Sequence, residues 1–335
     1  MSRSVIDDLA SRIGEHAANH DVSELEIVLH GGEPLLAGPE VIDYAVGAIR
    51  AALGHHRRAN FSIQTNGLLL DNEFLKLFDT LDLTVGLSLD GDREMNDRHR
   101  RQADGSGSYS KTAAAASLLS GYPRLFGGIL SVIDLRNNPV RTYEALARFG
   151  PPIIDFLLPH GNWSAPPPER PATDAAPYAD WLIAAFDHWY QAAGPSISVR
   201  LFEEIMRLLL GGSSRTEDVG LSPVTVVVIE SDGGIVLSDV LRSSADATGL
   251  NVSRDSFDAA LRTSRAAAVR ARAATLSAQC KACPVGRVCG GGLYAHRYRA
   301  ENGFDNPSVY CADLYRLITH IRARLAADLD VKDGE

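Results

Sequence analysis

The feature that most limits the possible folds is a regular alternation of short apolar stretches with helix-like stretches in the first half of the chain. Helix-like stretches show apolar residues at helical spacing, and the apolar stretches between them read as strands. Strands that alternate with helices of this length form β/α units with a parallel sheet, whose ligand-binding edge lies at the carboxyl ends of the strands. Five strands are expected, at residues 25–29, 61–65, 83–89, 128–133 and 153–158.

The second half of the chain has a different pattern. A proline-rich stretch over residues 159–177 predicts a linker or a loop over the sheet. Two apolar stretches flanking Ser231-Asp232-Gly233 predict a β-hairpin. Further helices are expected at residues 178–193, about 199–210, 256–274 and 312–327.

Composition excludes several classes of protein. The net charge of −9 argues against nucleic acid as a partner, because phosphate binding usually needs a basic surface. No apolar stretch is long enough to span a membrane, and the N-terminus lacks the basic and then apolar pattern of a signal peptide. A cytoplasmic protein with reduced cysteines and no membrane partner is therefore expected.

All four cysteines lie in the last quarter of the chain, at Cys280, Cys283, Cys289 and Cys311. Two thiolates spaced Cys-x-x-Cys on a tight turn can bind one metal, and a third close cysteine with one later cysteine completes a tetrahedral set. The spacing by itself is compatible with zinc, with an iron–sulfur cluster and with a disulfide pair.

Three consecutive predicted strands end in glycine and small polar residues. The first runs into Gly31-Gly32-Glu33-Pro34, the second into Gln64-Thr65-Asn66-Gly67 and the third into Ser88-Leu89-Asp90-Gly91. Glycines allow the backbone to approach a ligand closely, and a carboxylate at a strand end can accept hydrogen bonds from an ammonium group. Because these segments meet at one edge of a parallel sheet, they predict a single ligand site.

Taken in order, these segments and the cysteine block resemble the radical SAM enzymes that carry a C-terminal SPASM-type domain. The resemblance implies a partial (β/α)6 barrel without its first strand over 1–165, a helical connector over 166–223 and a SPASM-like cluster domain over 224–335. It implies that Gly31, Gly32, Glu33 and Pro34 hold the amino group of S-adenosylmethionine. Asn66 and Ser88 would face its methionine and ribose portions, and Ser131 would reach the ligand from the next strand.

More narrowly, the segments 155–163, 180–190 and 290–311 resemble the FxsB-type peptide maturases. That likeness implies a radical SAM oxidoreductase that installs a carbon–carbon, cyclophane-type crosslink in a ribosomally made precursor peptide. The precursor peptide and an electron donor such as flavodoxin or ferredoxin would be its partners. A sulfatase-maturase-like enzyme, which oxidises a cysteine or serine of a protein substrate, is the alternative, and a non-catalytic peptide-binding scaffold with a zinc or iron–sulfur site is another.

The resemblance also assigns the cysteines. Cys280, Cys283, Cys289 and Cys311 match the ligands of the second auxiliary [4Fe–4S] cluster of a SPASM domain. The first auxiliary cluster would need a cysteine where Leu293 stands, and no cysteine precedes Gln279. One auxiliary cluster is therefore expected, and the resemblance favours iron–sulfur over zinc.

The Cys-x3-Cys-x2-Cys motif that binds the radical SAM cluster is not part of this sequence. In the family it lies upstream of the first predicted helix, so this cluster is expected only if the N-terminus is extended. The start is expected to be an internal methionine, with a shortened inactive relative as the alternative. Without a preceding strand, residues 25–29 would form an unpaired apolar edge, which predicts poor expression or association of the 335-residue form.

Overall fold

The computed structural model describes residues 1–169, 175–192, 197–223, 226–236, 249–263, 271 and 273–329. The chain divides into two compact units. The first comprises residues 1–130, 149–152 and 226–267, and the second comprises 131–148, 153–225 and 268–335. Within the described residues, no helix combines the length and the apolar character needed to cross a membrane.

A six-stranded sheet follows the order of the chain, β1-β2-β3-β4-β5-β6. Adjacent strands from β1 to β4 pair in parallel, as do β5 and β6. This arrangement confirms the expected α/β fold, and β6 is the strand that sequence periodicity did not predict, because it has two residues. The strands are β1 (Glu24–Leu29), β2 (Arg58–Thr65), β3 (Leu83–Ser88), β4 (Phe126–Val132), β5 (Ile153–Leu157) and β6 (Ser198–Val199).

In the first unit, helices connect successive strands and pack against them. β3 alternates between fully buried and partly exposed positions, with Leu83, Val85 and Leu87 each at 0% exposure. This alternation is the expected pattern of a strand whose one face is covered by helices. The helical elements of this part are α1 (Arg3–Asn19), η1 (Pro34–Ala37), α2 (Pro39–Leu53), α3 (Asn72–Leu81), α4 (Arg93–His99) and α5 (Tyr109–Ser120).

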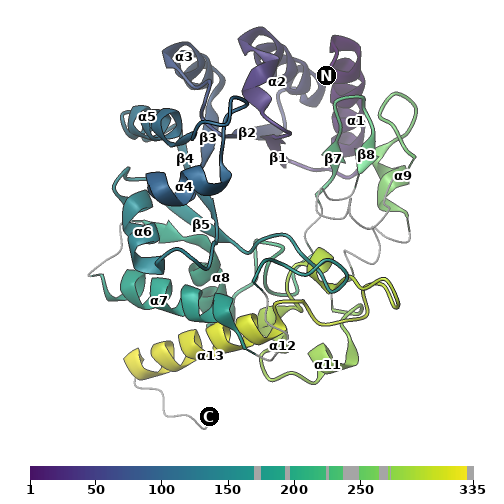
Figure 1. The fold of residues 1–335 in the computed structure, drawn as a ribbon. Coiled ribbons are helices and arrows are strands. Elements are labelled where there is room, and N and C mark those ends of the chain that lie inside the picture. The colour runs from purple at the N-terminus through teal and green to yellow at the C-terminus, as the bar shows by residue number, and fades with distance from the viewer. Residues whose placement is uncertain are drawn as a thin grey trace. The chain divides into compact units, whose positions relative to one another are not determined.

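The chain returns to the first unit in a hairpin formed by β7 (Val228–Ile229) and β8 (Ile235–Val236), followed by α9 (Phe257–Leu261). The hairpin predicted around Ser231-Asp232-Gly233 is confirmed, while residues 224, 225 and 237 of its predicted strands lie outside the described residues. In Figure 1 this segment lies beside α1, although more than two hundred residues separate the two in the sequence, and α1 and α9 are in contact. Residues 264–270 and 272 of the predicted helix 256–274 are also outside the description.

The second unit is built on helices that pack around aromatic side chains. Figure 1 shows α13 alongside α7, and α13 contacts both α7 and α8. Phe186 of α7 packs edge-on against Phe202 of α8 with ring centroids 5.3 Å apart, and both are fully buried. The helical elements are α6 (Pro139–Ala147), α7 (Pro177–Gln191), α8 (Arg200–Leu209), α11 (Ala278–Lys281), α12 (Gly286–Cys289), η3 (Tyr294–Arg297) and α13 (Cys311–Asp328).

Close packing of α1 against α2 depends on Gly14. A Cβ atom at this position would lie 2.8 Å from the carbonyl oxygen of Ala52 in α2. We expect Gly14→Ala to destabilise the protein by about 1–3 kcal/mol, because an added methyl group must push backbone apart. Gly47→Ala is the matched control, because Gly47 is an exposed position in α2 with no atom within 4 Å of an added Cβ.

Gly47→Ala should be neutral or should stabilise the protein by up to about 1 kcal/mol, since alanine favours a helix interior over glycine. Urea unfolding of both variants and the parent measures the difference. Equal midpoints for the two variants would contradict the packing described here.

Candidate functional site

Glu33 connects the carboxyl ends of β1 and β2. Its Oε1 accepts hydrogen bonds from Thr65 Oγ1 at 2.7 Å and from the backbone N–H of Leu35 at 3.0 Å, and its Oε2 accepts from the backbone N–H of Asn66 at 2.9 Å. Three donors to one carboxylate form a charge-assisted network that holds the two strand ends together. The structure therefore gives Glu33 an organising role that sequence reasoning did not predict.

Gly31 and Gly32 leave open space at this strand end. Gly31 adopts φ +137°, a conformation that side chains rarely take, and no atom lies within 4 Å of an added Cβ at either glycine. Pro34 begins η1, whose N-cap is Glu33. The backbone here is accessible to a ligand that approaches the edge of the sheet.

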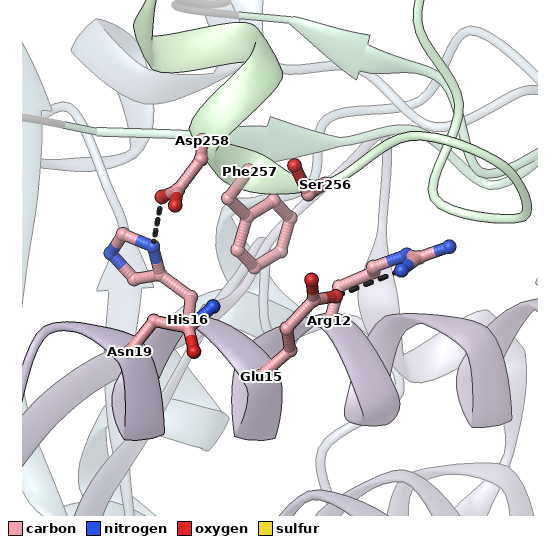
Figure 2. Close-up of a pocket in the computed structure, with 7 residues that line it drawn as sticks. All are labelled: Arg12, Glu15, His16, Asn19, Ser256, Phe257 and Asp258. Atoms are coloured by element: carbon pink, nitrogen blue, oxygen red, sulfur yellow. Dashed lines mark hydrogen bonds and ion pairs between the residues drawn. The ribbon is translucent and has the colours of Figure 1, made fainter.

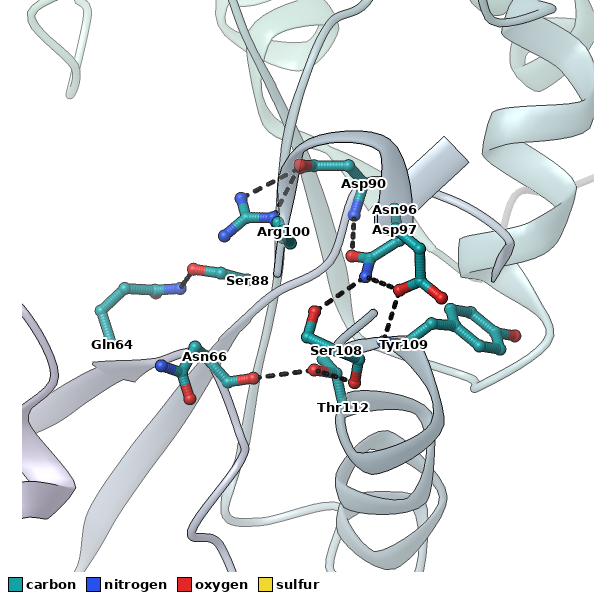
Figure 3. Close-up of polar contacts among 10 residues, drawn as sticks. All are labelled: Gln64, Asn66, Ser88, Asp90, Asn96, Asp97, Arg100, Ser108, Tyr109 and Thr112. Carbon is teal, nitrogen blue, oxygen red and sulfur yellow. Dashed lines mark hydrogen bonds and ion pairs between the residues drawn. The ribbon is translucent and has the colours of Figure 1, made fainter. Parts of the chain in front are cut away.

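Asn66 and Ser88 lie at the ends of the neighbouring strands, and both are engaged in local hydrogen bonds (Figure 3). The Oδ1 atom of Asn66 accepts from the backbone N–H of Leu68 at 2.9 Å, and Thr112 Oγ1 donates to its backbone carbonyl at 3.0 Å. Ser88 Oγ accepts from Gln64 Nε2 at 2.9 Å. Glu33, Asn66 and Ser88 thus follow three successive strands at one edge of the first unit.

A second polar network follows β3, and the sequence analysis did not predict it. Arg100 donates to both carboxylate oxygens of Asp90, at 2.6 and 3.0 Å. The side chain of Asn96 is fully buried and bridges the backbone N–H of Asp90 and the hydroxyl of Ser108. Figure 3 shows these contacts converging at the start of α4 and α5. The network fixes the loop after β3.

Ser131, the remaining predicted ligand residue, lies in the second unit on β4. Its side chain is 1% exposed, and its hydroxyl has no hydrogen-bond partner among the described residues. A buried hydroxyl without a partner costs free energy, so this atom is suited to bind a group that the protein alone does not supply.

The four cysteines lie in the second unit, on or next to two short helices and at the start of the long helix α13. Cys280 belongs to α11, Cys283 follows it in a turn, Cys289 ends α12 and Cys311 begins α13. All four are free thiols. Burial raises the pKa of Cys289 to about 12 and that of Cys311 to about 11, and the neighbouring cysteines contribute further in the same direction. The four thiols therefore share one site in which thiolates need a cationic partner.

Both candidate groups suit four thiolates. Tetrahedral zinc would bind all four sulfurs to one ion at about 2.3 Å, whereas a [4Fe–4S] cluster would bind each cysteine to a different iron.

Arg297 supplies positive charge beside these thiols. Its side chain is fully buried, and it donates to the backbone carbonyls of Gly290, Gly291 (3.1 Å) and Gly292 (3.4 Å). No carboxylate pairs with it within the described residues, and its Nη1 atom has no hydrogen-bond partner. Burial lowers the pKa of Arg297, and the charges of Cys280 and Cys289 act in the opposite direction.

Burying a guanidinium group that has no carboxylate partner is strongly unfavourable, unless an anion of a different kind lies near it. Four cysteine thiolates bound to an iron–sulfur cluster provide such an anion. The donor set and the orphaned Nη1 atom of Arg297 therefore fit a negatively charged metal–thiolate group, such as an iron–sulfur cluster, at this site. Gly290 completes the cradle, because with φ +60° an added Cβ would lie 1.8 Å from the carbonyl oxygen of Gly220.

His296 and Trp163 are held by packing and by contacts to neighbouring segments. His296 is 4% exposed and stacks edge-on with Tyr310, with ring centroids 5.0 Å apart. Trp163 donates from Nε1 to the carbonyl oxygen of Pro307 at 2.8 Å, and the guanidinium of Arg299 lies 4.8 Å from the centre of its ring. These contacts join the segment after β5 to the segment that precedes α13.

Comparison with known proteins gives sequence relatives over nearly the whole chain, while no family model matches it. The chain is 25% identical to the cysteine-type anaerobic sulfatase-maturating enzyme of Clostridium perfringens strain 13, over 97% of this chain and 88% of that protein. It is 26% identical to the Clostridium novyi enzyme of the same name, over 69% of this chain and 63% of that protein, so this match spans less than two thirds of the relative. The serine-type enzyme of Klebsiella aerogenes is 24% identical over 90% of this chain and 73% of that protein.

Solved structures agree with the sequence relatives. Native anSMEcpe with bound AdoMet superposes with a TM-score of 0.85 at 23% identity, covering 99% of this chain and 90% of that one. Streptococcus suis SuiB superposes with a TM-score of 0.59 at 16% identity, covering 90% of this chain and 69% of that one. The chain therefore has the α/β fold of a radical SAM sulfatase-maturating enzyme, and its homologues are radical SAM oxidoreductases that use [4Fe–4S] clusters and S-adenosylmethionine.

The predicted likeness to radical SAM enzymes is confirmed at the level of the fold and the homologous enzymes. The narrower likeness to FxsB-type cyclophane-forming maturases is not confirmed. The relatives support the sulfatase-maturase alternative better than the crosslinking function.

The charge of Arg297 should raise the reduction potential of a cluster held by the four cysteines. We expect Arg297→Met to lower that potential by on the order of 50–100 mV relative to Arg297→Lys, because a buried charge stabilises the more negative reduced cluster. Arg287→Met is the control, since Arg287 is exposed and screened by water although it lies only two residues from Cys289. Redox titration followed by electron paramagnetic resonance measures the potentials, and equal values for the two methionine variants would rule out this role.

His296 should make stability depend on pH. Burial lowers its pKa from the usual value near 6.5 to about 4. Above pH 6.5 the side chain is neutral in both states. As the pH falls from 6.5 towards 4, the unfolded chain binds a proton that the folded protein does not, so stability is lost.

We expect the parent to lose about 2 kcal/mol more than His296→Phe between pH 7 and pH 5, from about 1.4 kcal/mol per pKa unit. Urea unfolding at the two pH values measures this difference. Parallel losses in the two proteins would show that His296 does not titrate as described.

Proposed function

We propose that this protein is a radical SAM oxidoreductase that binds S-adenosylmethionine and oxidises a side chain of a protein or peptide substrate, as a sulfatase-maturating enzyme does. The observation that carries the proposal is the polar edge of the first unit, where Glu33 fastens the ends of β1 and β2 beside two open glycines. The near full-length similarity to the Clostridium perfringens enzyme supports the same class. The division into barrel 1–165, connector 166–223 and SPASM-like domain 224–335 is part of the proposal.

In this proposal, each predicted ligand residue has a physical task. Gly31, Gly32 and Pro34 present backbone to the amino group of the ligand. Asn66 and Ser88 present polar groups from the next two strands. The hydrogen bonds of Glu33 hold the ends of β1 and β2 in a fixed position relative to each other. Ser131 offers a hydroxyl that otherwise has no partner. When bound, S-adenosylmethionine with a reduced iron–sulfur cluster supplies one-electron chemistry for hydrogen abstraction.

The four cysteines and Arg297 have a separate task. Cys280, Cys283, Cys289 and Cys311 would hold an auxiliary [4Fe–4S] cluster, which is suited to accept the electron released when the substrate is oxidised. Arg297 balances its negative charge from within the cradle of glycine carbonyls. The 335-residue sequence contains no other cysteines, so it holds the ligands for one cluster and not for a second. Tests on this chain therefore measure the binding of S-adenosylmethionine and not turnover.

A peptide partner is supported by solved relatives. One structure is titled anSMEcpe with bound AdoMet and Cp18Cys peptide, and another is SuiB bound to precursor peptide SuiA. Carbon–carbon crosslinking of a precursor peptide is the second candidate, favoured by the fold likeness to SuiB and by the segments 155–163, 180–190 and 290–311. The higher identity and coverage of the maturases place it second.

Binding of S-adenosylmethionine to the full chain tests the proposal. We expect Ser131→Ala to weaken binding about 2- to 12-fold, the equivalent of one lost hydrogen bond of 0.5–1.5 kcal/mol. The same change should not lower the stability of the free protein, because the buried hydroxyl has no partner there. Thr319→Val is the matched control, since Thr319 Oγ1 in α13 is also buried without a partner but follows no strand.

Calorimetry with S-adenosylmethionine measures both variants. No binding by the parent, or equal affinity of Ser131→Ala and the parent, would refute the assigned ligand site. In a form of the protein extended to include the Cys-x3-Cys-x2-Cys motif, the products then separate the two reactions. A cysteine or serine peptide converted to an aldehyde supports the maturase, and loss of two hydrogens with a new carbon–carbon bond supports crosslinking.

A further inference from the structure

A cluster of two histidines and one aspartate lies in the first unit and includes none of the candidate ligand residues described above. His16 lies in the last turn of α1 and His20 is the C-cap residue that follows the helix, so the two residues are one helical turn apart. Asp258 comes from α9, which contacts α1. Figure 2 shows the imidazole of His16 and the carboxylate of Asp258 pointing toward each other, with Phe257 beside them.

The three side chains already converge on a small volume. His16 Nδ1 lies 2.9 Å from Asp258 Oδ1, and His20 Nε2 lies 2.8 Å from the same oxygen. All three atoms are within 4.8 Å of one another. In a tetrahedral zinc site, nitrogen and oxygen ligands at 2.0–2.2 Å from the metal are about 3.4 Å apart, so adjustments of less than about 1.5 Å would suffice.

We propose that His16, His20 and Asp258 bind a divalent transition-metal ion of the zinc class, which fastens α9 to α1. Two imidazoles and one carboxylate form a mixed nitrogen and oxygen ligand set that such ions prefer over magnesium or calcium. Three protein ligands leave one tetrahedral position for water. The ion would replace the hydrogen bonds that now join the two imidazoles to Asp258 Oδ1.

The surroundings suit a cation. Hydrogen bonds from His20 and His16 lower the pKa of Asp258, so its carboxylate is ionised and available as a ligand. The nearby guanidinium of Arg12 is held away, since Nη1 donates to Glu15 at 2.8 Å and Nε donates to the carbonyl oxygen of Val252 at 2.9 Å. The ring of His16 packs edge-on against Phe257 with centroids 6.1 Å apart, which restricts its orientation.

A structural role follows from where the ligands lie. His16 and Asp258 are 242 positions apart in the sequence, and the hydrogen bonds of the cluster connect the N-terminal helix to the segment that contains the β7–β8 hairpin. A metal ion bound by both elements closes this long loop in the folded state. Because the ion binds the folded protein and not the unfolded chain, its presence raises the melting temperature.

Titration of the full chain with Co²⁺, used as a spectroscopic probe, tests the site. Ligation by histidine and carboxylate gives ligand-field bands without the thiolate-to-cobalt charge-transfer band that the four cysteines would produce. His20→Asn removes an exposed ligand while leaving the helix intact, and it should weaken binding by at least about tenfold, since losing even an outer-shell partner of a metal ligand costs 10–100-fold.

His320→Asn is the matched control. His320 Nε2 pairs with Asp187 Oδ1 at 2.7 Å, a similar histidine–aspartate pair without a second histidine. It should bind Co²⁺ as the parent does, and Zn²⁺ should raise the melting temperature of the parent and of His320→Asn by more than that of His20→Asn. A spectrum with thiolate charge transfer alone, or equal affinities of the two histidine variants, would overturn the proposal.

Discussion

The hydrogen bonds of Glu33 are the constraint on which the candidate ligand site depends. Parallel strands leave their carboxyl ends as separate loops, and nothing in strand pairing itself holds those loops in a common geometry. One carboxylate that accepts from Thr65, Asn66 and Leu35 does so for β1 and β2. The polar contacts of Ser88, Asp90 and Asn96 order the next strand end in the same way, so the edge is prepared before any ligand binds.

The cysteine site illustrates a second constraint, the high cost of burying charge. Arg297 is fully buried and, among the described residues, its side chain donates hydrogen bonds to backbone carbonyls, while burial raises the pKa of Cys289 and Cys311. Each charge is unfavourable alone, and together with iron they form a compensated site. This reasoning identifies a site for a negatively charged metal–thiolate group, and the choice of an iron–sulfur cluster belongs to the proposed function.

Local sequence patterns predicted much of the fold and the outline of both sites. The alternation of strands and helices, the hairpin at 231–233 and the cysteine block are short-range signals that survive in the structure. The narrower family likeness was less informative, because the relatives point to sulfatase-maturating enzymes rather than to cyclophane formation. Short segments such as 155–163 carry too few residues to separate subtypes that share one fold.

The amino-acid sequence by itself determined the order of the β/α elements, the glycine and polar residues that end the first three strands, and the block of four cysteines proposed as ligands. Only the tertiary structure showed that Glu33 joins two strand ends, that Arg297 is buried without a carboxylate, and that Asp258 meets His16 and His20. The physical reason is the range of the interactions. Periodicity and turn chemistry act over a few residues, whereas these contacts connect side chains that approach one another only after distant elements have packed.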